Sequence, residues 1–412
     1  VHAFFSKTPG TVPTATGPLQ WLKPVGTTCL HAVHLSPQPS AKVAAFDLDG
    51  TVIASLPWSA PPLKWHWWDA DVPGKLAKAA ADGYAIVLIS NQGGIKIGGK
   101  KEKDWKAKMA LIAAAVPDLP FRLFAATEKD NYRKPMTGMW GELERLYAEE
   151  GVQIDKASSF FVGDAAGRHF ANSEKKKDFA ATDRKWALNV DVKFYTPEEY
   201  FLGKAVDPNF TLKGFHVSSL PSLPLYTPSS SPLLPHPSGQ ELVLFVGYPC
   251  LGKTSFFRQH FEAAGYLHIN QDTLKTRDKC VKAVQEALAA GKKCVVDNTN
   301  RDAHTRKYYI DVARKLKVPY GACMRFTGSV ELAWHNNLYR AYCLPPSVAA
   351  REPPREALPK MAFTKFENDL EEPELAEGVA QIKKVNWVFS GTEEERKAWS
   401  KWMLQFDEKK NE

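Results

Sequence analysis

The sequence lacks long hydrophobic runs and closely paired cysteines. No uninterrupted apolar segment of the 412 residues reaches the roughly 18 residues that a membrane-spanning helix needs. The six cysteines contain no Cys-x-x-Cys pair, which argues against a compact zinc site. Their wide spacing indicates reduced thiols. No secretion signal is visible either, so we expect neither a membrane-bound nor a secreted protein.

A large excess of charge of one sign is also missing. The chain has 54 Lys and Arg against 46 Asp and Glu, a net charge of +8. This balance suits a polyanionic partner such as nucleic acid, but many metabolic enzymes share it. Hydrophobic residues make up 44% and charged residues 24%, as in ordinary globular proteins, which excludes collagenous and disordered classes.

Strand-like and helix-like segments alternate along most of the chain, which is typical of α/β folds with parallel sheets. Residues 1–41 are rich in Pro, Thr and Gly and predict an irregular arm. We expect one α/β domain over 42–215, a Pro- and Ser-rich linker over 216–239, and a second α/β domain over 240–412. The expected strands lie near 42–49, 83–92, 121–127, 158–167, 241–246, 294–300 and 320–326, and the helices near 73–82, 103–116, 139–151, 256–265, 279–293 and 303–317.

Two carboxylates follow the first buried strand. Residues i and i+2 of a strand point the same way, so Asp47 and Asp49 can face one site. One carboxylate can attack phosphorus and form an aspartyl-phosphate. The other can protonate the leaving oxygen and then activate water. Because neighbouring carboxylates repel each other, the pair also predicts Mg²⁺, a hard cation that prefers oxygen ligands.

Further polar residues end the later strands of the first domain. The Ser90 hydroxyl could hold a phosphate oxygen, Lys134 could neutralise a transferring phosphoryl group, and Asp164 could ligate a metal. In an open parallel sheet, such residues converge at the carboxyl edge. Any one of them could instead be a strand-end cap, but their order along the chain favours a shared site.

A phosphate-binding loop begins the second domain. Gly247-Tyr-Pro-Cys-Leu-Gly252-Lys253-Thr254 fits G-x-x-x-x-G-K-[ST] between a predicted strand and a predicted helix. Its backbone N–H groups would cradle the phosphates of ATP, Lys253 would reach the β- and γ-phosphates, and Thr254 would bind Mg²⁺. Ser255 completes the candidate nucleotide-binding set.

A kinase also needs a base and cations. Asp272 is the best candidate for the base, and a helix N-cap before Thr273 is the alternative. Asp297 ends a strand and could support metal or substrate. Arg340 falls late in the domain, where a lid Arg could stabilise the transferring phosphoryl group.

The first domain resembles the haloacid dehalogenase phosphatases. The resemblance rests on Asp-Leu-Asp-Gly-Thr, a Ser before Asn-Gln, a Lys before Pro, and Gly-Asp-Ala-Ala-Gly-Arg. It implies that Asp47 is the nucleophile and Asp49 the general acid/base, and that Ser90 and Lys134 bind phosphate. Mg²⁺ would be held by the carboxylates of Asp47 and Asp164 and by the carbonyl of Asp49. The resemblance also implies a further acid, for which Asp178 and Asp183 both remain candidates.

Both domains together look like the polynucleotide kinase/phosphatase family, over roughly residues 20 to 390. The runs YRKPMTGMW, INQDTLK, VVDNTN and AWHNNLYR carry this resemblance. It implies a nuclear, monomeric enzyme that uses Mg²⁺ and ATP to remove 3′-phosphates and add 5′-phosphates at DNA ends before ligation. Asp272 would activate the 5′-hydroxyl and Arg340 would act from the lid.

The resemblance has two departures. Many eukaryotic members carry a forkhead-associated domain that this sequence does not contain, so docking to phosphorylated scaffolds is not expected. Lys275 stands where the phage enzyme has Arg, which reduces a bidentate phosphate contact to a point charge. The candidate substrate contacts are Asn91, Arg133, Arg168, Lys275 and Asp297.

Several interpretations remain open from the sequence. A kinase/phosphatase for RNA ends would carry the same motifs, and a small-metabolite enzyme or a non-catalytic scaffold are further alternatives. The run Lys175–Lys177 could contact a nucleic-acid backbone or form a solvated turn. Trp65, Trp67 and Trp68 could stack on bases, although packing against the hydrophobic core is the favoured interpretation.

Overall fold

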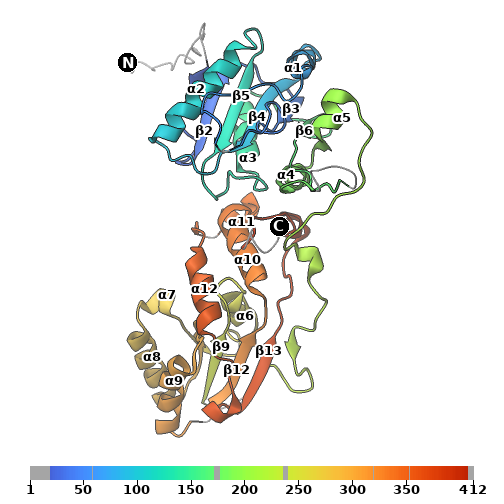
Figure 1. Ribbon diagram of the computed structural model, residues 1–412. Coiled ribbons are helices and arrows are strands. Elements are labelled where there is room, and N and C mark those ends of the chain that lie inside the picture. The colour runs from blue at the N-terminus through green and yellow to red at the C-terminus, as the bar shows by residue number, and fades with distance from the viewer. Residues whose placement is uncertain are drawn as a thin grey trace, which may run out of the picture. The chain divides into compact units, whose positions relative to one another are not determined.

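The computed structural model describes residues 19–57, 59–170, 177–234, 240–318, 320–351 and 353–406. The chain divides into two compact units, the first ending at Lys213 and the second beginning at Gly214. Each unit is built around its own mainly parallel sheet with helices on both faces (Figure 1). The expectations for residues 1–18, Lys175, Lys176, 235–239 and 407–412 lie outside the described residues.

The sheet of the first unit has seven strands in the order β1-β2-β5-β4-β3-β6-β7. The five strands β3 to β7 are parallel, whereas β2 runs antiparallel to β5 and β1 antiparallel to β2. The elements are β1 (Gln20–Trp21), β2 (Cys29–His34), β3 (Val43–Phe46), α1 (Val72–Ala81), β4 (Ala85–Asn91), α2 (Lys100–Ala114), β5 (Phe121–Ala126), α3 (Gly138–Glu149), β6 (Phe160–Val162), α4 (Thr182–Val190), β7 (Lys193–Tyr195) and α5 (Pro197–Leu202).

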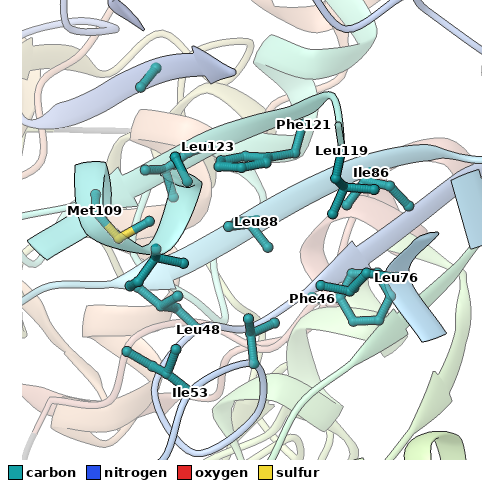
Figure 2. Packing of buried hydrophobic residues seen from close by; sticks show 14 of the residues in the cluster. Phe46, Leu48, Ile53, Leu76, Ile86, Leu88, Met109, Leu119, Phe121 and Leu123 are labelled. Atoms are coloured by element: carbon teal, nitrogen blue, oxygen red, sulfur yellow. The ribbon is translucent and has the colours of Figure 1, made fainter. Parts of the chain in front are cut away.

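Alternate residues of the central strands enter opposite core layers. In β3, Ala44 and Phe46 pack on the side of α1 and α2, whereas Val43 and Ala45 pack on the side of α3 and α4. Figure 2 shows the first of these layers, with Phe46 and Leu88 facing helix residues. Burial on both faces explains why β3 and β4 read as continuous apolar runs in the sequence.

The predicted irregular arm is corrected over residues 19–41. This segment supplies β1 and β2, which extend the sheet at the edge of β5. Two histidines break the apolar pattern of β2, yet both are buried. His31 lies 2.8 Å from Arg122 Nη1 through its Nε2 atom, and burial lowers the pKa of His31 to about 4. A neutral imidazole can therefore serve as a core side chain here, which the composition of the arm did not reveal.

The sheet of the second unit has six strands in the order β10-β11-β9-β12-β13-β8, of which only β8 is antiparallel among the strands described. Helices α8 and α9 cover one face, and α6, α10, α12 and α13 cover the other. The elements are η1 (Val217–Ser219), β8 (Tyr226–Thr227), β9 (Glu241–Val246), α6 (Lys253–His260), β10 (Leu267–Ile269), α7 (Gln271–Leu274), α8 (Arg277–Ala289), β11 (Lys293–Asp297), α9 (Ala303–Lys315), β12 (Tyr320–Phe326), α10 (Val330–Tyr342), α11 (Pro346–Ala349), α12 (Lys360–Asp369), η2 (Leu375–Glu377), β13 (Gln381–Val385) and α13 (Glu393–Trp399).

The expected linker is corrected over residues 216–234, because this segment is part of the second unit. Its strand β8 pairs with β13, and Asn386 Nδ2 donates to the carbonyl of Pro224 at 2.8 Å. The ammonium of Lys383 donates to Ser231 Oγ at 2.6 Å. Proline blocks long regular pairing, but Lys383 of β13 and Asn386 just after it donate hydrogen bonds to carbonyls of the segment. These partners lie far away in the sequence, so local composition does not reveal them.

Two expectations from composition concern the whole chain. All six cysteines are free thiols. Among the residues that the structure describes, none of the helices combines the length and the apolar character needed to cross a bilayer.

Candidate active sites

Three carboxylates meet at the carboxyl edge of the first sheet. Asp47 follows β3, Asp164 follows β6, and Asp183 lies in the first turn of α4. One oxygen of each lies within 4.8 Å of one oxygen of each of the others. The geometry therefore selects Asp183 as the further acid of the cluster. Asp178 instead forms a buried ion pair with Arg168, at 2.8 Å.

Two glycines allow the carboxylates to come this close. Gly50 has φ +89°, and a Cβ atom there would overlap the Asp164 carboxylate. A Cβ atom on Gly163 would lie 2.6 Å from Asp183 Cβ. Glycine therefore serves a steric purpose at both positions, and at Gly50 it also permits the left-handed backbone.

Lys134 is the cation of this cluster. Its ammonium lies 2.6 Å from Asp47 Oδ1 and 2.8 Å from Asp183 Oδ1, and it donates to the carbonyl of Ile89 at 2.8 Å. Burial alone would lower the pKa of Lys134, but Asp183 and Asp47 outweigh it and the net shift is upward. The lysine is therefore charged, and its side chain is only 1% exposed.

The neighbouring carboxylates affect one another's protonation. Burial raises the pKa of Asp47 well above its ordinary value; Lys134 opposes this shift, and Asp183 and Asp164 add to it. Bringing three carboxylate oxygens this close together is costly unless cations offset their charge. Converging carboxylate oxygens are the donor set that Mg²⁺ prefers, so the residues present fit this ion.

Gln92 connects the second aspartate to Ser90, the candidate phosphate ligand. Its Nε2 atom donates to Asp49 Oδ2 at 2.6 Å and to Ser90 Oγ at 2.8 Å. Ser90 is buried, whereas the Asp49 side chain is 38% exposed. Asp49 can therefore meet a leaving group from solvent, while Asp47 is held at the base of the site.

The structure gives two of the candidate substrate contacts structural partners. Asn91 Oδ1 accepts the backbone N–H of Lys134 at 2.9 Å, and its Nδ2 donates to the carbonyl of Lys134 at 3.1 Å. Asn91 therefore positions Lys134. Arg168 is only 4% exposed, and its guanidinium donates to Asp178 and Glu198, which leaves it poorly placed for a nucleic-acid backbone.

The remaining candidates of the first unit separate into two groups. Arg133 is half-buried beside the turn after β4, where a Cβ atom on Gly93 would lie 3.1 Å from its Nη1. It stays a candidate contact near the site. Trp65, Trp67 and Trp68 pack against the hydrophobic core, as the packing alternative expects.

The phosphate-binding loop connects β9 to α6. Gly252 has φ +77° and precedes the first residue of α6, Lys253, so the helix begins three residues earlier than the sequence predicts. The Lys253 ammonium donates to the carbonyls of Gly247 and Tyr248 at 3.0 and 2.6 Å. Burial lowers the pKa of Lys253 to about 8. Ser255 is exposed in the first turn of α6, at the end where helix N–H groups favour anions.

Asp297 contacts the threonine of this loop. Thr254 Oγ1 donates to Asp297 Oδ2 at 2.6 Å, and His268 Nε2 lies 2.9 Å from the same oxygen. Asp297 ends β11 and is buried. A hydroxyl and a carboxylate in contact form an oxygen donor pair that fits Mg²⁺ beside the loop.

Asp272 is exposed on the short helix α7. The N-cap of this helix is Asn270, whose Oδ1 accepts the N–H of Thr273 at 2.9 Å, so the capping alternative for Asp272 is wrong. Lys275 donates to the carbonyl of Asp272 at 2.7 Å. Asn298 Oδ1 accepts the N–H of Gln271 at 2.8 Å, which connects α7 to the loop after β11.

Helix α10 places Arg340 against the phosphate-binding loop. Arg340 Nη1 donates to Cys250 Sγ at 3.4 Å. From the same helix, Asn336 Nδ2 donates to the carbonyl of Cys250 at 3.1 Å, and Asn336 Oδ1 accepts the indole N–H of Trp399 at 2.8 Å. Arg340 and the loop are thus connected through one face of α10.

The two sites lie in segments that match two known family models. Residues 42–201 match the model described as polynucleotide kinase 3 phosphatase, and residues 242–342 match an AAA domain. The bifunctional polynucleotide phosphatase/kinase of Schizosaccharomyces pombe is 36% identical over 88% of this chain and 83% of that protein. The chain belongs to the bifunctional polynucleotide phosphatase/kinase family.

Other relatives agree with this membership. A putative bifunctional polynucleotide phosphatase/kinase of Acanthamoeba polyphaga mimivirus is 31% identical over 90% of this chain and 90% of that protein. An Arabidopsis thaliana protein named polynucleotide 3′-phosphatase ZDP is 31% identical over 41% of this chain and 25% of that protein. As a phosphatase/kinase, the chain carries the acidic cluster in its phosphatase half and the phosphate-binding loop in its kinase half.

Three contacts of this phosphatase/kinase escaped the sequence analysis: Gln92 on Asp49, His268 on Asp297, and Asn336 on the phosphate-binding loop. Gln92 lies in the Ser-Asn-Gln run and could have been found there. Asn336 lies in the AWHNNLYR run, which marked the segment but not its contact, and His268 comes from a short strand for which local spacing carries no signal.

Proposed function

We propose that this enzyme removes 3′-phosphates from DNA ends through an aspartyl-phosphate and phosphorylates 5′-hydroxyls with ATP, so that a ligase can seal the break. The observation that supports it most is the presence of two phosphoryl-transfer sites on one chain of this family. Nuclear location, the use of Mg²⁺ in both halves and action as a monomer belong to the same proposal and rest on the family.

In the phosphatase half, a carboxylate oxygen of Asp47 attacks phosphorus and the bond from phosphorus to O3′ breaks. Asp49 gives its proton to O3′, so the DNA leaves as an alcohol. Asp49 then takes a proton from water, the resulting hydroxide attacks the aspartyl-phosphate, and phosphate leaves with Asp47 restored. Ser90 and Lys134 hold phosphate oxygens, and Gln92 orients Asp49.

The acidic cluster would bind the metal ion, and its lysine orients the attacking carboxylate. Asp47, Asp164 and Asp183 would hold Mg²⁺, which when bound offsets the negative charge of the attacking carboxylate and of the phosphate. Lys134 fixes Asp47 Oδ1 at 2.6 Å, which leaves the other oxygen of Asp47 for attack.

In the kinase half, Asp272 takes the proton from the 5′-hydroxyl while that oxygen attacks the γ-phosphorus of ATP, and ADP leaves. Lys253 and the backbone N–H groups of the loop hold the phosphates. Thr254 and Asp297 would hold Mg²⁺, which offsets the phosphate charge. Arg340, whose contact with Cys250 puts it beside the loop, contacts the transferring group.

The first test is release of phosphate from a single-stranded 3′-phosphorylated DNA oligomer with Mg²⁺ and without ATP. A matched RNA oligomer and a nucleoside 3′-monophosphate serve as comparisons. Faster release from DNA than from both supports the proposal. Preference for RNA would favour an RNA-end enzyme, and equal release from the mononucleotide would favour a small-metabolite enzyme.

A further inference from the structure

Lys108 lies at the rim of the phosphatase site, and the proposed chemistry has not used it. Its ammonium is 3.8 Å from Asp49 Oδ1, and its side chain is 16% exposed. The other oxygen of Asp49 accepts the amide N–H of Gln92 at 2.6 Å. The two oxygens of the general acid thus face a neutral donor on one side and a cation on the other.

The position of Lys108 is set by the packing of α2. Its neighbour Met109 is buried in the core layer that includes Leu48, the residue between the two catalytic aspartates. Figure 2 shows Met109 on α2 above Leu48 and Ile53. Because α2 is anchored on the loop that carries Asp49, Lys108 keeps its place at the rim.

Other lysines of α2 have different surroundings. Lys106 forms an ion pair with Glu102 at 2.6 Å and lies over the ring of Trp21. Lys101 is exposed on the first turn of the helix. Lys108 differs from both because its partner is a residue of the reaction centre.

We propose that Lys108 binds the phosphodiester that precedes the 3′-terminal nucleotide, and so makes the phosphatase prefer polynucleotide ends over nucleoside 3′-monophosphates. This inference rests on the proposed function. Asp49 gives its proton to O3′, so its carboxylate marks the side of the site where the leaving nucleotide lies. The next anionic group of that leaving strand is the preceding phosphodiester. A lysine ammonium is a compact cation that contacts such a group without reading sequence.

A simpler role for Lys108 would be to offset the charge of Asp49 alone. In that case its loss would alter the hydrolysis of every phosphate ester by the same factor. A phosphodiester contact instead alters only those substrates that carry the phosphodiester charge. The two roles therefore differ in substrate dependence.

The experiment compares Lys108→Met with the unaltered enzyme and with Lys101→Met, which removes the same charge from the same helix. The three substrates are a 3′-phosphorylated DNA oligomer, the same oligomer with an uncharged methylphosphonate as its last internucleotide linkage, and p-nitrophenyl phosphate. We expect Lys108→Met to raise KM for the normal oligomer about five- to tenfold relative to both other enzymes. The slope of log KM against log salt should fall by about 0.7.

The methylphosphonate substrate completes the test. For the unaltered enzyme, KM for the methylphosphonate oligomer should be about five- to tenfold higher than KM for the normal oligomer. Lys108→Met should add less than a further twofold, because the variant and the methylphosphonate remove the same contact. Lys108→Arg should restore most of the preference. The methylphosphonate comparison needs no variant, so an absent effect overturns the inference even if Lys108→Met fails to fold, and a positive effect is assigned to Lys108 by the milder variant Lys108→Arg and by Lys108→Met.

Three results would overturn the inference. They are an equal rise in KM for Lys108→Met on all three substrates, equal KM values for Lys108→Met and Lys101→Met on the normal oligomer, and no effect of the methylphosphonate on KM of the unaltered enzyme. Failure of the proposed function looks different. In that case the unaltered enzyme would hydrolyse p-nitrophenyl phosphate and not the 3′-phosphorylated oligomer.

Discussion

Replacing Lys134 by methionine should destabilise the phosphatase unit strongly, because its ammonium balances buried carboxylates. The group contacts Asp47 and Asp183 at 2.6 and 2.8 Å and also donates to the carbonyl of Ile89. Removing one partner of a buried ion pair costs about 3–5 kcal/mol, since the other charge stays buried without compensation. We therefore expect the free energy of unfolding of this unit to fall by about that amount without Mg²⁺.

The loss should depend on pH and on Mg²⁺. Burial already raises the pKa of Asp47, and the Lys134 ammonium opposes this shift, so without it the folded state of the variant binds more protons than the unfolded state. Stability is then retained at low pH and lost as pH rises, so the deficit should be smaller at pH 5 than at pH 8. Mg²⁺ binds the folded cluster and should also reduce the deficit.

Hydrogen exchange measured by mass spectrometry in increasing denaturant can follow this loss in each unit separately. Peptides from β3 and β4 report on the phosphatase unit, and peptides from β9 act as an internal reference within the same molecule. Lys78→Met is the matched control, because Lys78 forms an exposed ion pair with Asp82 and should matter by less than about 0.5 kcal/mol. A change below about 1 kcal/mol in β3 and β4 at both pH values would refute the charge-balance argument.

Three further outcomes are expected. Asp47→Asn should abolish phosphate release and spare the kinase, and Lys253→Ala should do the reverse; loss of both activities from either change would mean that the halves are coupled or unfolded. Asn336→Asp removes the amide N–H that the loop carbonyl accepts, so KM for ATP should rise about tenfold, as for one lost hydrogen bond, while phosphatase kinetics in the same preparation serve as reference. Burial lowers the pKa of His335 to about 4, so the unfolded state takes up a proton at a higher pH than the folded state does. The free energy of unfolding of the kinase unit should therefore fall by up to about 3 kcal/mol between pH 6.5 and 4. Hydrogen exchange of β9 peptides over this pH range measures this loss, with His335→Gln as comparison. The same pH dependence of unfolding free energy in His335→Gln would contradict the role given to His335.

The sequence alone determined the chemistry and the order of the two units. Asp47 and Asp49 directly follow one buried strand, and the phosphate-binding loop is a continuous run between a strand and a helix. Such features can be predicted from the sequence because their geometry depends only on backbone conformation within a few residues. The same holds for the buried parallel strands, whose apolar runs need no distant information.

Only the tertiary structure decided which distant residues meet. It selected Asp183 over Asp178, because α4 begins beside Asp164 and Asp178 is already paired with Arg168. It also added β1, β2 and β8 to the sheets, where strands elsewhere in the chain supply partners to segments whose composition predicts irregular structure. Lys108 reached the rim of the site because Met109, beside it, is buried against Leu48. Burial and pairing across long sequence separations are properties of the packed chain, and local spacing does not encode them.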